Sequence, residues 1–231
     1  MINTTHTKTC QVIRFGKLDY QDAWFKQREL VRQRSSGQIG DTLMLLEHPH
    51  TYTLGRATRD GHLLVSPETL IAQGVTLIES DRGGDITYHG PGQVVGYPIL
   101  KLSRHGGDLL RYLRMIEEVI IVVLADYGIK AGRIAGLTGV WVGDAKIAAI
   151  GVKLSASGVT QHGFALNVTT DMQYFAQIIP CGIVGKDVTS MARLLDNPPA
   201  QHEVERRVAH AFGEVFQVDL QFEANVEDML H

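Results

Sequence analysis

The chain contains little cysteine, no long hydrophobic run and no strong excess of either charge. Among its 231 residues only Cys10 and Cys181 are cysteines, which excludes a disulfide framework or a cysteine-rich zinc site and is typical of a reducing cytoplasm. No apolar run approaches the roughly 20 residues that span a bilayer, and residues 1–6 lack the positively charged start of a secretory signal. A net charge of −3 argues against a surface devoted to nucleic acid. We therefore expect a cytoplasmic protein that binds neither membrane nor nucleic acid.

Glycine is the residue that the chain has in excess. With 44% hydrophobic and 20% charged residues the composition is that of a globular protein, and the length fits one domain or one domain with an appended lobe. Between Arg82 and Gly163, however, lie 15 of the 24 glycines, and this window carries 9 Lys and Arg against 6 Asp and Glu. A glycine-dense and locally basic middle indicates where the functional site lies.

Apolar periodicity predicts strands on both sides of one long helix, without the regular alternation of a doubly wound sheet, so we expect an α+β fold. The strongest helix pattern starts at Asp108, which can cap it, and ends before Gly128. Further helices are expected over 19–35 (with Asp19 as N-cap), 171–178, 188–195 and 201–216, strands over 42–46, 51–56, 75–79, 93–100 and 164–168, and a β-hairpin over 139–154. One catalytic domain over 1–231 is the expected organisation, with a helical C-terminal lobe over 170–231 as a variant of it.

The segment 82–93, with the sequence RGGDITYHGPGQ, follows directly on a predicted strand. Paired glycines let the backbone adopt positive φ angles and approach a ligand closely, and Arg82, Tyr88 and His89 bring a cation and hydrogen-bond donors to the same place. The segment is neither a Walker phosphate loop nor a G-x-G-x-x-G dinucleotide fingerprint. We interpret it as a substrate-facing loop, with an ordinary glycine-rich hairpin as the alternative.

Cys181 is the candidate nucleophile. It stands between a proline and Gly182, which leaves open space beside the thiol and a free backbone N–H for an oxyanion. A nucleophilic thiol needs a base, and Lys146, His89 and His162 are the candidates. A buried structural cysteine is the alternative. The ten histidines show no metal-binding spacing such as H-E-x-x-H, so we predict no metal site.

These segments together resemble the lipoyl(octanoyl) transferases, a family related to the catalytic domains of biotin and lipoate protein ligases. The resemblance covers residues 41–191 and departs from the family over 152–161, which is less rich in arginine and slightly longer. The matching motifs, in the order of the family, are Arg82-Gly83-Gly84, Thr87-Tyr88-His89, Gly92-Gln93, Tyr97, Lys146-Ile147-Ala148-Ala149-Ile150-Gly151, His162-Gly163-Phe164-Ala165-Leu166-Asn167 and Pro180-Cys181-Gly182.

The resemblance implies a biotin/lipoate protein ligase-like α+β fold with a mixed main sheet, a smaller second sheet and flanking helices. It implies that Cys181 carries the acyl group and that Lys146 lowers the pKa of its thiol. The residues implied to contact the acyl substrate are Arg82, Gly83, Gly84, Asp85, Ile86, Thr87, Tyr88, His89, Ala149, Ile150, Gly151, Gly163, Phe164 and Ala165.

The implied activity is transfer of an octanoyl group from octanoyl-acyl carrier protein to a specific lysine of lipoyl domains. These acceptors are the acyltransferase subunits of 2-oxoacid dehydrogenases and the glycine cleavage H protein, and the reaction needs no ATP, cofactor or metal. Three alternatives stay open: an ATP-dependent lipoate or biotin protein ligase on the same fold, a cysteine hydrolase that uses Cys181, His162 and Asn167, and a non-catalytic module that binds acyl carrier protein or lipoyl domains.

Overall fold

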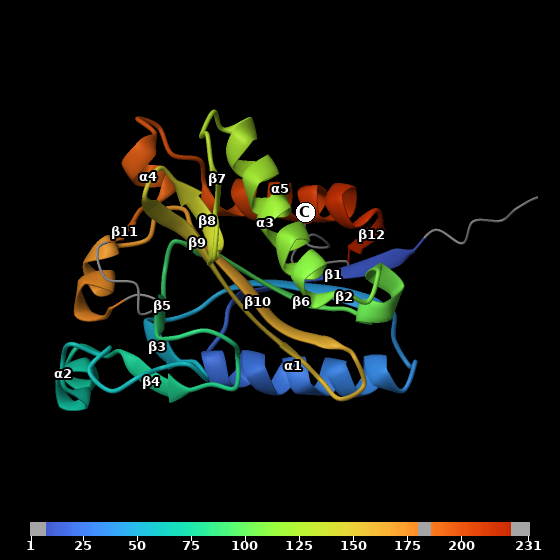
Figure 1. Cartoon of the computed structure of the whole chain (residues 1–231), viewed down its shortest axis with the longest axis horizontal. Coiled ribbons are helices and arrows are strands. Elements are labelled where there is room, and N and C mark those ends of the chain that lie inside the picture. Colours follow the sequence, from blue (N-terminus) through green and yellow to red (C-terminus); the bar gives the residue numbers. More distant parts are fainter. Residues whose placement is uncertain (1–7, 180–185, 223–231) are drawn as a thin grey trace, which may run out of the picture.

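The computed structural model of the chain describes residues 8–179 and 186–222 (Figure 1). Helices and strands alternate irregularly along it. In chain order the elements are β1 (Thr9–Lys17), α1 (Tyr20–Ser35), β2 (Asp41–Glu47), β3 (Thr51–Leu54), α2 (Pro67–Ala72), β4 (Thr76–Glu79), β5 (Thr87–His89), β6 (Gln93–Ile99), the 3₁₀ helix η1 (Leu102–His105), α3 (Leu109–Asp126), β7 (Gly132–Ile134), β8 (Leu137–Val142), β9 (Ala145–Leu154), β10 (Thr160–Asn167), the 3₁₀ helix η2 (Met172–Gln177), β11 (Asp187–Val188), α4 (Met191–Leu194), α5 (Gln201–Phe216) and β12 (Asp219–Phe222).

A mixed main sheet and a smaller second sheet form the frame, as the resemblance implied. The main sheet has the strand order β12-β1-β2-β6-β10-β9-β8-β7, and the small sheet has the order β4-β3-β5. The strands β12, β1 and β2 run parallel, whereas each neighbouring pair from β2 to β7 is antiparallel. Strand β11 pairs in parallel with the start of β9, beyond the point where its pairing with β10 ends. The fold class is therefore α+β, as predicted.

Helix α3 covers one face of the main sheet together with α5 (Figure 1). The Asp108 carboxylate accepts a hydrogen bond from the backbone N–H of Arg111 at 2.8 Å, and Gly128 follows the helix with a φ of +75°. Ile116 and Ile120 of its apolar stripe are fully buried in the core that α3 and α5 share with the sheet. The predicted helix and both of its end signals are confirmed.

Helix α1 covers the opposite face of the main sheet, where it packs on β6 and β10. It begins where expected, but the Asp19 side chain makes no capping hydrogen bond. Only the backbone carbonyl of Asp19 takes part, accepting the N–H of Ala23 at 2.9 Å. The helix buries Tyr20 and Gln27. The Tyr20 hydroxyl bonds to that of Ser80, directly after β4 of the small sheet, and the Gln27 side chain accepts a hydrogen bond from the backbone of β10.

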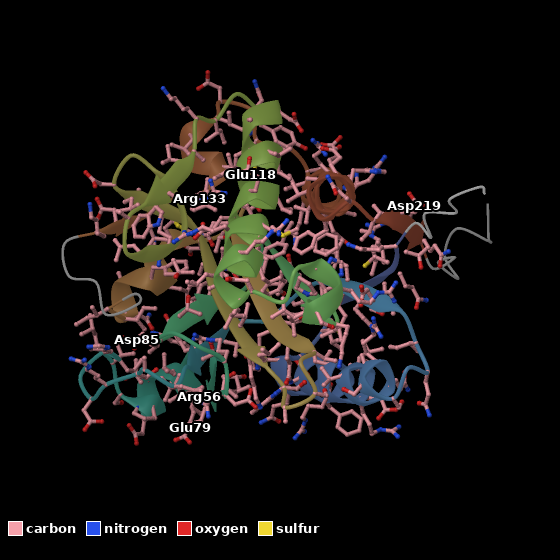
Figure 2. All side chains as sticks on the ribbon, turned by 45° about the vertical axis from the view of Figure 1, so that its right-hand side comes forward. Arg56, Glu79, Asp85, Glu118, Arg133 and Asp219 are labelled. Carbon is pink, nitrogen blue, oxygen red and sulfur yellow. The ribbon has the colours of Figure 1, made fainter. Side chains whose placement is uncertain are left out.

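A buried acidic side chain ties α3 to the β7–β8 hairpin. Glu117 is fully buried and accepts hydrogen bonds from Arg133 at 2.9 Å and from the backbone N–H of Gly139 at 3.2 Å. Arg133 also pairs with Glu118 at 2.6 Å, and both residues are labelled in Figure 2. These contacts fix the hairpin at one side of the main sheet.

Two predicted helices in the C-terminal third are wrong in type or extent. The segment predicted as a helix over 171–178 forms the 3₁₀ helix η2, which Asp171 caps at the N–H of Gln173. The helix predicted over 188–195 is confined to α4, because Val188 pairs with Lys146 of β9 and so becomes part of a strand. A long-range pairing overrides the local helix pattern here.

The predicted helix over 201–216 is confirmed as α5. Its residues Val204, Val208 and Phe212 are buried in the same core as α3, and β12 continues the main sheet beside β1. The C-terminal segment therefore shares the core of the main sheet. Over residues 8–179 and 186–222, no helix has both the length and the apolar character needed to cross a membrane.

Candidate active site

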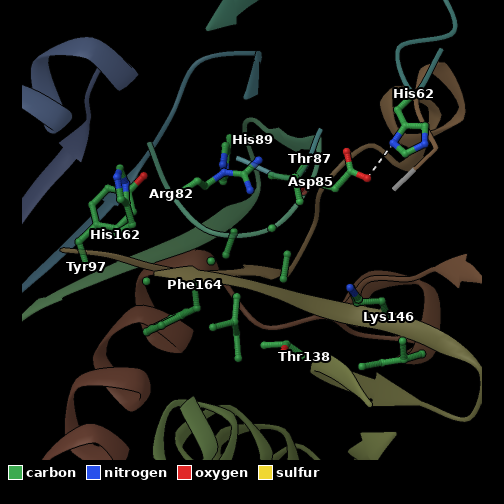
Figure 3. A pocket seen from close by; sticks show the side chains of 18 of the residues that line it. His62, Arg82, Asp85, Thr87, His89, Tyr97, Thr138, Lys146, His162 and Phe164 are labelled. Atoms are coloured by element: carbon green, nitrogen blue, oxygen red, sulfur yellow. Dashed lines mark hydrogen bonds and ion pairs between the residues drawn. The ribbon is translucent and has the colours of Figure 1, made fainter. Parts of the chain in front are cut away.

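A cleft of about 440 Å³ lies between the small sheet and the strands β9 and β10 (Figure 3). Lys146 and most residues of the three predicted substrate-contact segments line it. The predicted substrate contacts among the lining residues are Arg82, Gly84, Asp85, Thr87, His89, Ala149, Ile150, Gly151, Gly163, Phe164 and Ala165.

Ile86, Tyr88 and Gly83 do not line this cleft. Side chains alternate along a strand, so Thr87 and His89 face the cleft whereas Ile86 and Tyr88 point away from it. Both are fully buried in the apolar cluster beneath the small sheet. Gly83 instead donates its backbone N–H to the carbonyl of Val152 at 3.0 Å.

Glycines let the loop after β4 lie directly against β9. A Cβ at Gly151 would come within 2.7 Å of the Gly83 carbonyl oxygen, closer than real Cβ atoms approach, and Gly84 has a φ of +87°. The loop thus approaches the backbone of β9 closely, and its predicted close approach to a ligand stays a prediction. Gly163 likewise allows β10 to lie close to β6, because a Cβ added at Gly163 would lie 2.1 Å from the carbonyl oxygen of Gly96.

The Lys146 side chain is buried at one end of the cleft, with only 6% of the residue exposed. Its Nζ lies 4.8 Å from the centroid of the Trp141 ring, a cation–π distance, and its stem runs past Gly139, where a Cβ would lie 3.3 Å from Cε. The Lys146 carbonyl accepts the N–H of Thr189 at 2.9 Å. The backbone of this lysine is thus held by both β8 and β11.

Cys181 lies outside the described residues, so its predicted role stays a prediction. The described chain on either side of segment 180–185 is attached to the cleft. Ile179 donates its N–H to the carbonyl of His62 at 2.8 Å, and β11 pairs beside Lys146. His62 is itself a lining residue, and its Nδ1 lies 2.7 Å from a carboxylate oxygen of Asp85 (Figure 3).

The Arg82 guanidinium ties the glycine loop to the small sheet. Its Nη2 donates to the carbonyl of Thr53 at 2.6 Å, its Nε donates to the Thr53 hydroxyl at 3.0 Å, and its Nη1 donates to the carbonyl of Gly83 at 3.1 Å. Arg82 is 6% exposed, so its charge acts inside the protein. The geometry therefore gives Arg82 a role in shaping the loop, and its contact with substrate stays a prediction.

At the other end of the cleft His162 pairs with Asp81 across 2.7 Å between Nε2 and Oδ1. Burial lowers the pKa of His162 below its ordinary value although Asp81 opposes this, and the hydrogen bond from His162 holds the pKa of Asp81 well below its usual range. His162 is therefore neutral at pH 7, with its proton on Nε2. Its Nδ1 is bare and has no hydrogen-bond partner among the described residues.

His89 is neutral as well and lies beside Tyr20 and Tyr97. Burial, and after it the neighbouring His48 and Arg82, hold the pKa of His89 well below its ordinary value. A side-chain hydrogen bond with Gln93 acts against this lowering of the pKa. Tyr20 and Tyr97, which line the cleft with His89 and His162, bond to the Ser80 hydroxyl at 2.8 Å and to His48 Nε2 at 2.7 Å. We call Tyr20, His89, Tyr97 and His162 the end wall.

Sequence reasoning named three of the end-wall residues but missed Tyr20 and the pairing of Asp81. Asp81 stands directly before Arg82, and this position was the only local signal for it. Tyr20 lies in α1, far from the motifs, and only the packing of that helix brings it to the cleft. No pattern within α1 distinguishes it from an ordinary core tyrosine.

Asn167 and His162 have different partners. Asn167 donates from Nδ2 to the carbonyl of Thr189 at 3.0 Å, and its Oδ1 accepts from Gln93 at 2.9 Å. The histidine–asparagine contact that a cysteine hydrolase of this kind would use is thus not formed. Within residues 8–179 and 186–222, no group of three or more His, Cys, Asp and Glu side chains is arranged to hold a metal ion.

The chain belongs to the lipoyl protein ligase A/B catalytic domain family, whose model matches residues 19–213. Among individual proteins it is similar to the octanoyltransferase of Chloroflexus aurantiacus, with 56% identity over 219 residues that cover 94% of this chain and 98% of that protein. The octanoyltransferase of Chloroflexus aggregans is 55% identical over 213 residues, which cover 91% of this chain and 96% of the relative.

Solved structures share the fold at low identity. Lipoate-protein ligase A bound with ATP matches with a TM-score of 0.71 at 15% identity, over 97% of this chain and 92% of that one. An archaeal bipartite lipoate protein ligase from Thermoplasma acidophilum, described with its E2 lipoyl domain, matches with a TM-score of 0.66 at 15% identity, over 97% and 90% of the two chains. The lipoate-protein-ligase-like fold that the resemblance implied is confirmed.

Proposed function

We infer that the protein is an octanoyltransferase that moves an octanoyl group from octanoyl-acyl carrier protein to a lysine of lipoyl domains. The observation that carries this inference is 56% identity across 98% of the length of a curated octanoyltransferase. The acceptors that we propose are the lipoyl domains of 2-oxoacid dehydrogenase acyltransferase subunits and the glycine cleavage H protein. We further propose that the chain acts as one catalytic domain in the cytoplasm, without ATP, cofactor or metal.

Cys181 and Lys146 carry the chemistry in this proposal. Lys146 takes the thiol proton of Cys181, and the thiolate attacks the thioester carbonyl of the donor. The bond between that carbonyl carbon and the sulfur of the phosphopantetheine arm breaks, and the released sulfur is protonated. The neutral amine of the acceptor lysine then attacks the enzyme thioester, Lys146 takes the proton that this amine loses, an amide forms, and Cys181 leaves as thiolate. Backbone N–H groups stabilise the oxyanion in both steps.

The described geometry supports an acyl substrate in the cleft. Small residues of β9 and β10, Ala149, Gly151 and Ala165, line it and leave room for a hydrocarbon chain. Burial of the roughly seven methyl and methylene groups of octanoate is worth about 5 kcal/mol, at ~0.8 kcal/mol for each group. Lys146 is buried where the carbonyl end of such a chain would lie, next to Thr87 and Ala149.

The test is the intact mass of the enzyme after incubation with octanoyl-acyl carrier protein, followed by peptide mapping. We expect one added octanoyl group on the peptide that contains Cys181. Cys181→Ala should lose this adduct and at least ~1,000-fold in transfer to a lipoyl domain. Cys10→Ala is the matched control, because Cys10 is fully buried and burial raises the pKa of its thiol to about 12. An adduct that persists in Cys181→Ala contradicts the proposal.

Lys146→Ala tests the base. We expect transfer to fall ~100- to 10,000-fold and alkylation of Cys181 near neutral pH to slow, because the thiol loses its proton acceptor. Lys130→Ala, which changes an exposed lysine, is the control. An alkylation pH profile that is unchanged in Lys146→Ala excludes this role. Transfer that requires ATP would favour the ligase alternative.

A further inference from the structure

Lys146 faces the cleft because of an irregularity in β9. On this strand Lys146 and Ala148 lie opposite two consecutive residues of β8, so Ile147 is one extra residue, which makes a β-bulge. Ile147 and Ala148 are both buried in the core. Lys146 and Ala149, on either side of them, both line the cleft. In a regular strand residues three apart face opposite sides, so the bulge is what turns Lys146 away from the core and into the cleft.

The bulge lies where β9 parts from β10. The pairing of β10 with β9 ends at Leu166 and Ala148, which is two residues short of Lys146. Strand β11 occupies the place beside β9 from there on. Its Val188 pairs with Lys146, and the N–H of Thr189 donates to the Lys146 carbonyl at 2.9 Å. Strand β11 is only two residues long, so the placement of the Lys146 backbone depends on what holds this short strand.

The side chain of Asn167 connects β10 to β11. Asn167 directly follows the last residue of β10 that pairs with β9, and its Nδ2 donates to the carbonyl of Thr189 at 3.0 Å. The backbone of Thr189 is thus held through its carbonyl by Asn167, while its N–H holds Lys146. Asn167 and Thr189 are both buried, so loss of the amide would leave a carbonyl without a hydrogen bond. A side chain makes the link here that the backbone ladder makes elsewhere.

Gln93 fixes the direction in which the Asn167 amide points. Gln93 Oε1 accepts the N–H of Gly90 at 3.3 Å, and Gln93 Nε2 donates to the carbonyl of Tyr88 at 3.1 Å. These backbone partners assign both ends of the Gln93 amide. The same Nε2 donates to Asn167 Oδ1 at 2.9 Å, so the NH₂ group of Asn167 faces Thr189. The Asn167 side chain is therefore set by β6 to hold β11.

We propose that Asn167 is a positioning residue for Lys146. Through Thr189 it holds the backbone of the bulged part of β9, and it thereby keeps the Lys146 amine beside the Trp141 ring at the end of the cleft. The inference rests on the proposed function, in which Lys146 is the base. Displacement of a reacting group by about 1 Å costs up to ~100-fold in rate, so a loosened β11 lowers activity even where the protein stays folded.

The test is Asn167→Leu, which approximately keeps the shape of the side chain and removes both of its hydrogen bonds without adding a charge. We expect kcat for octanoyl transfer to a lipoyl domain to fall ~10- to 100-fold, and KM for octanoyl-acyl carrier protein to change by less than ~3-fold. Alkylation of Cys181 should require a higher pH, by ~0.5 unit or more, because its base is displaced. Hydrogen exchange at the Thr189 amide, measured by NMR, should be ~10-fold faster or more.

Thr160→Val is the matched control. Thr160 is fully buried at the opposite end of β10, where its hydroxyl donates to the carbonyl of Pro98 at 2.7 Å and accepts the N–H of Leu100 at 2.9 Å. The substitution removes two buried hydrogen bonds from the same strand, so both variants should lower the midpoint of chemical denaturation. Thr160→Val should nevertheless leave kcat within ~2-fold of the wild type, and the alkylation profile and the exchange at Thr189 unchanged.

Equal losses of kcat in the two variants would show that Asn167 only stabilises the fold. Faster exchange at Thr189 with an unchanged kcat would show that its hydrogen bond does not position the base. Either result overturns the proposal. Where Asn167→Leu does not fold, the smaller change Asn167→Ser is measured in its place and judged by the same outcomes. Absence of octanoyl transfer in the wild type would overturn the proposed function itself, whereas normal transfer with either result above would overturn only the positioning role.

Discussion

Two aspartate–histidine pairs of this molecule, each with a buried histidine, are alike in geometry and differ in surroundings. His105 bonds to Asp41 at 2.8 Å, and His162 bonds to Asp81 at 2.7 Å. Asp41 also accepts from Arg34 at 2.7 Å, and the side chains of both Asp41 and His105 are 1% exposed. Asp81 is 30% exposed and pairs with Lys153 at the rim.

The difference shows what each pair does. Around Asp41 every carboxylate oxygen is bonded within the protein, since the backbone N–H of Lys101 donates to it as well, so this cluster fastens β2 to the segment after β6. The second pair fixes the ring of His162, a residue that lines the cleft, through Nε2. One pair joins elements of the core, and the other fixes the orientation of a side chain that lines the cleft.

The largest effect is expected for Asp41→Asn. The substitution leaves the buried charge of Arg34 uncompensated, which costs about 3–5 kcal/mol of unfolding free energy. Chemical denaturation at pH 7 measures it. Asp19→Asn changes an exposed aspartate whose side chain makes no capping hydrogen bond, and it should cost less than ~0.5 kcal/mol. Equal losses in the two variants would show that the Asp41 cluster is not the fastening that we describe.

The pH dependence of stability should separate the two regions. Burial lowers the pKa of His48, which supports the end wall, to about 4, so the unfolded chain binds its proton first as the pH falls below 6.5. Stability is then lost between pH 6.5 and 4, at about 1.4 kcal/mol for each pH unit and histidine kept neutral. Burial raises the pKa of Asp41, but hydrogen bonds from His105 and Arg34 outweigh burial and lower this pKa below its ordinary value of 3.8. The stability that the Asp41 carboxylate contributes is therefore lost only as the pH falls below 3.8.

Chemical denaturation at several pH values between 7 and 3 measures how the free energy of unfolding depends on pH. His48→Gln should flatten the curve between pH 6.5 and 4, and His202→Gln, at an exposed position, should not change its slope. A wild-type stability that stays constant down to pH 4 would mean that burial does not keep His48 neutral.

Of the two aspartates that pair with histidine, Asp81 is the one whose change to Asn should have the smaller effect on stability. The amide oxygen still accepts the hydrogen bond of His162, and the pair with Lys153 lies at the rim, so the loss should be ~1 kcal/mol or less. The pKa of His162 should fall further, because the Asp81 charge raises it in the wild type. Titration by NMR measures this shift, and a rise in the pKa of His162 would contradict the geometry.

The parts of the fold with strong local signals could be predicted from the sequence. The helix over 108–126 has a capping aspartate, an apolar stripe and a closing glycine, and the hairpin over 139–154 has its turn at Gly143, with a φ of +58°. The strands β1 and β12 could not be predicted, because each is fixed by partners distant in sequence. The same holds for Val188, whose pairing with Lys146 overrides its helix pattern.

The candidate site could be predicted as segments but not as a surface. The glycine spacing predicted a close backbone approach in the loop after β4, and in the structure Gly83 of this loop lies close to the Val152 carbonyl oxygen of β9. The strand alternation that turns Ile86 and Tyr88 away from the cleft is visible in the sequence once β5 is recognised as a strand. The contact between Asp81 and His162 depends on the fold, because no local pattern relates residues so far apart.

Strand β1 pairs in parallel with β12, and Thr9 lies opposite Asp219. As the first strand of the described chain, β1 thus acquires this neighbour only after nearly all of the rest of the described chain has been made. Until then β1 has an unpaired edge, which is a template for unwanted association with other chains. Pairings of such sequence separation also form slowly. We therefore expect completion of this sheet edge to be a late event in folding, and nascent chains that lack β12 to be the species most prone to aggregate.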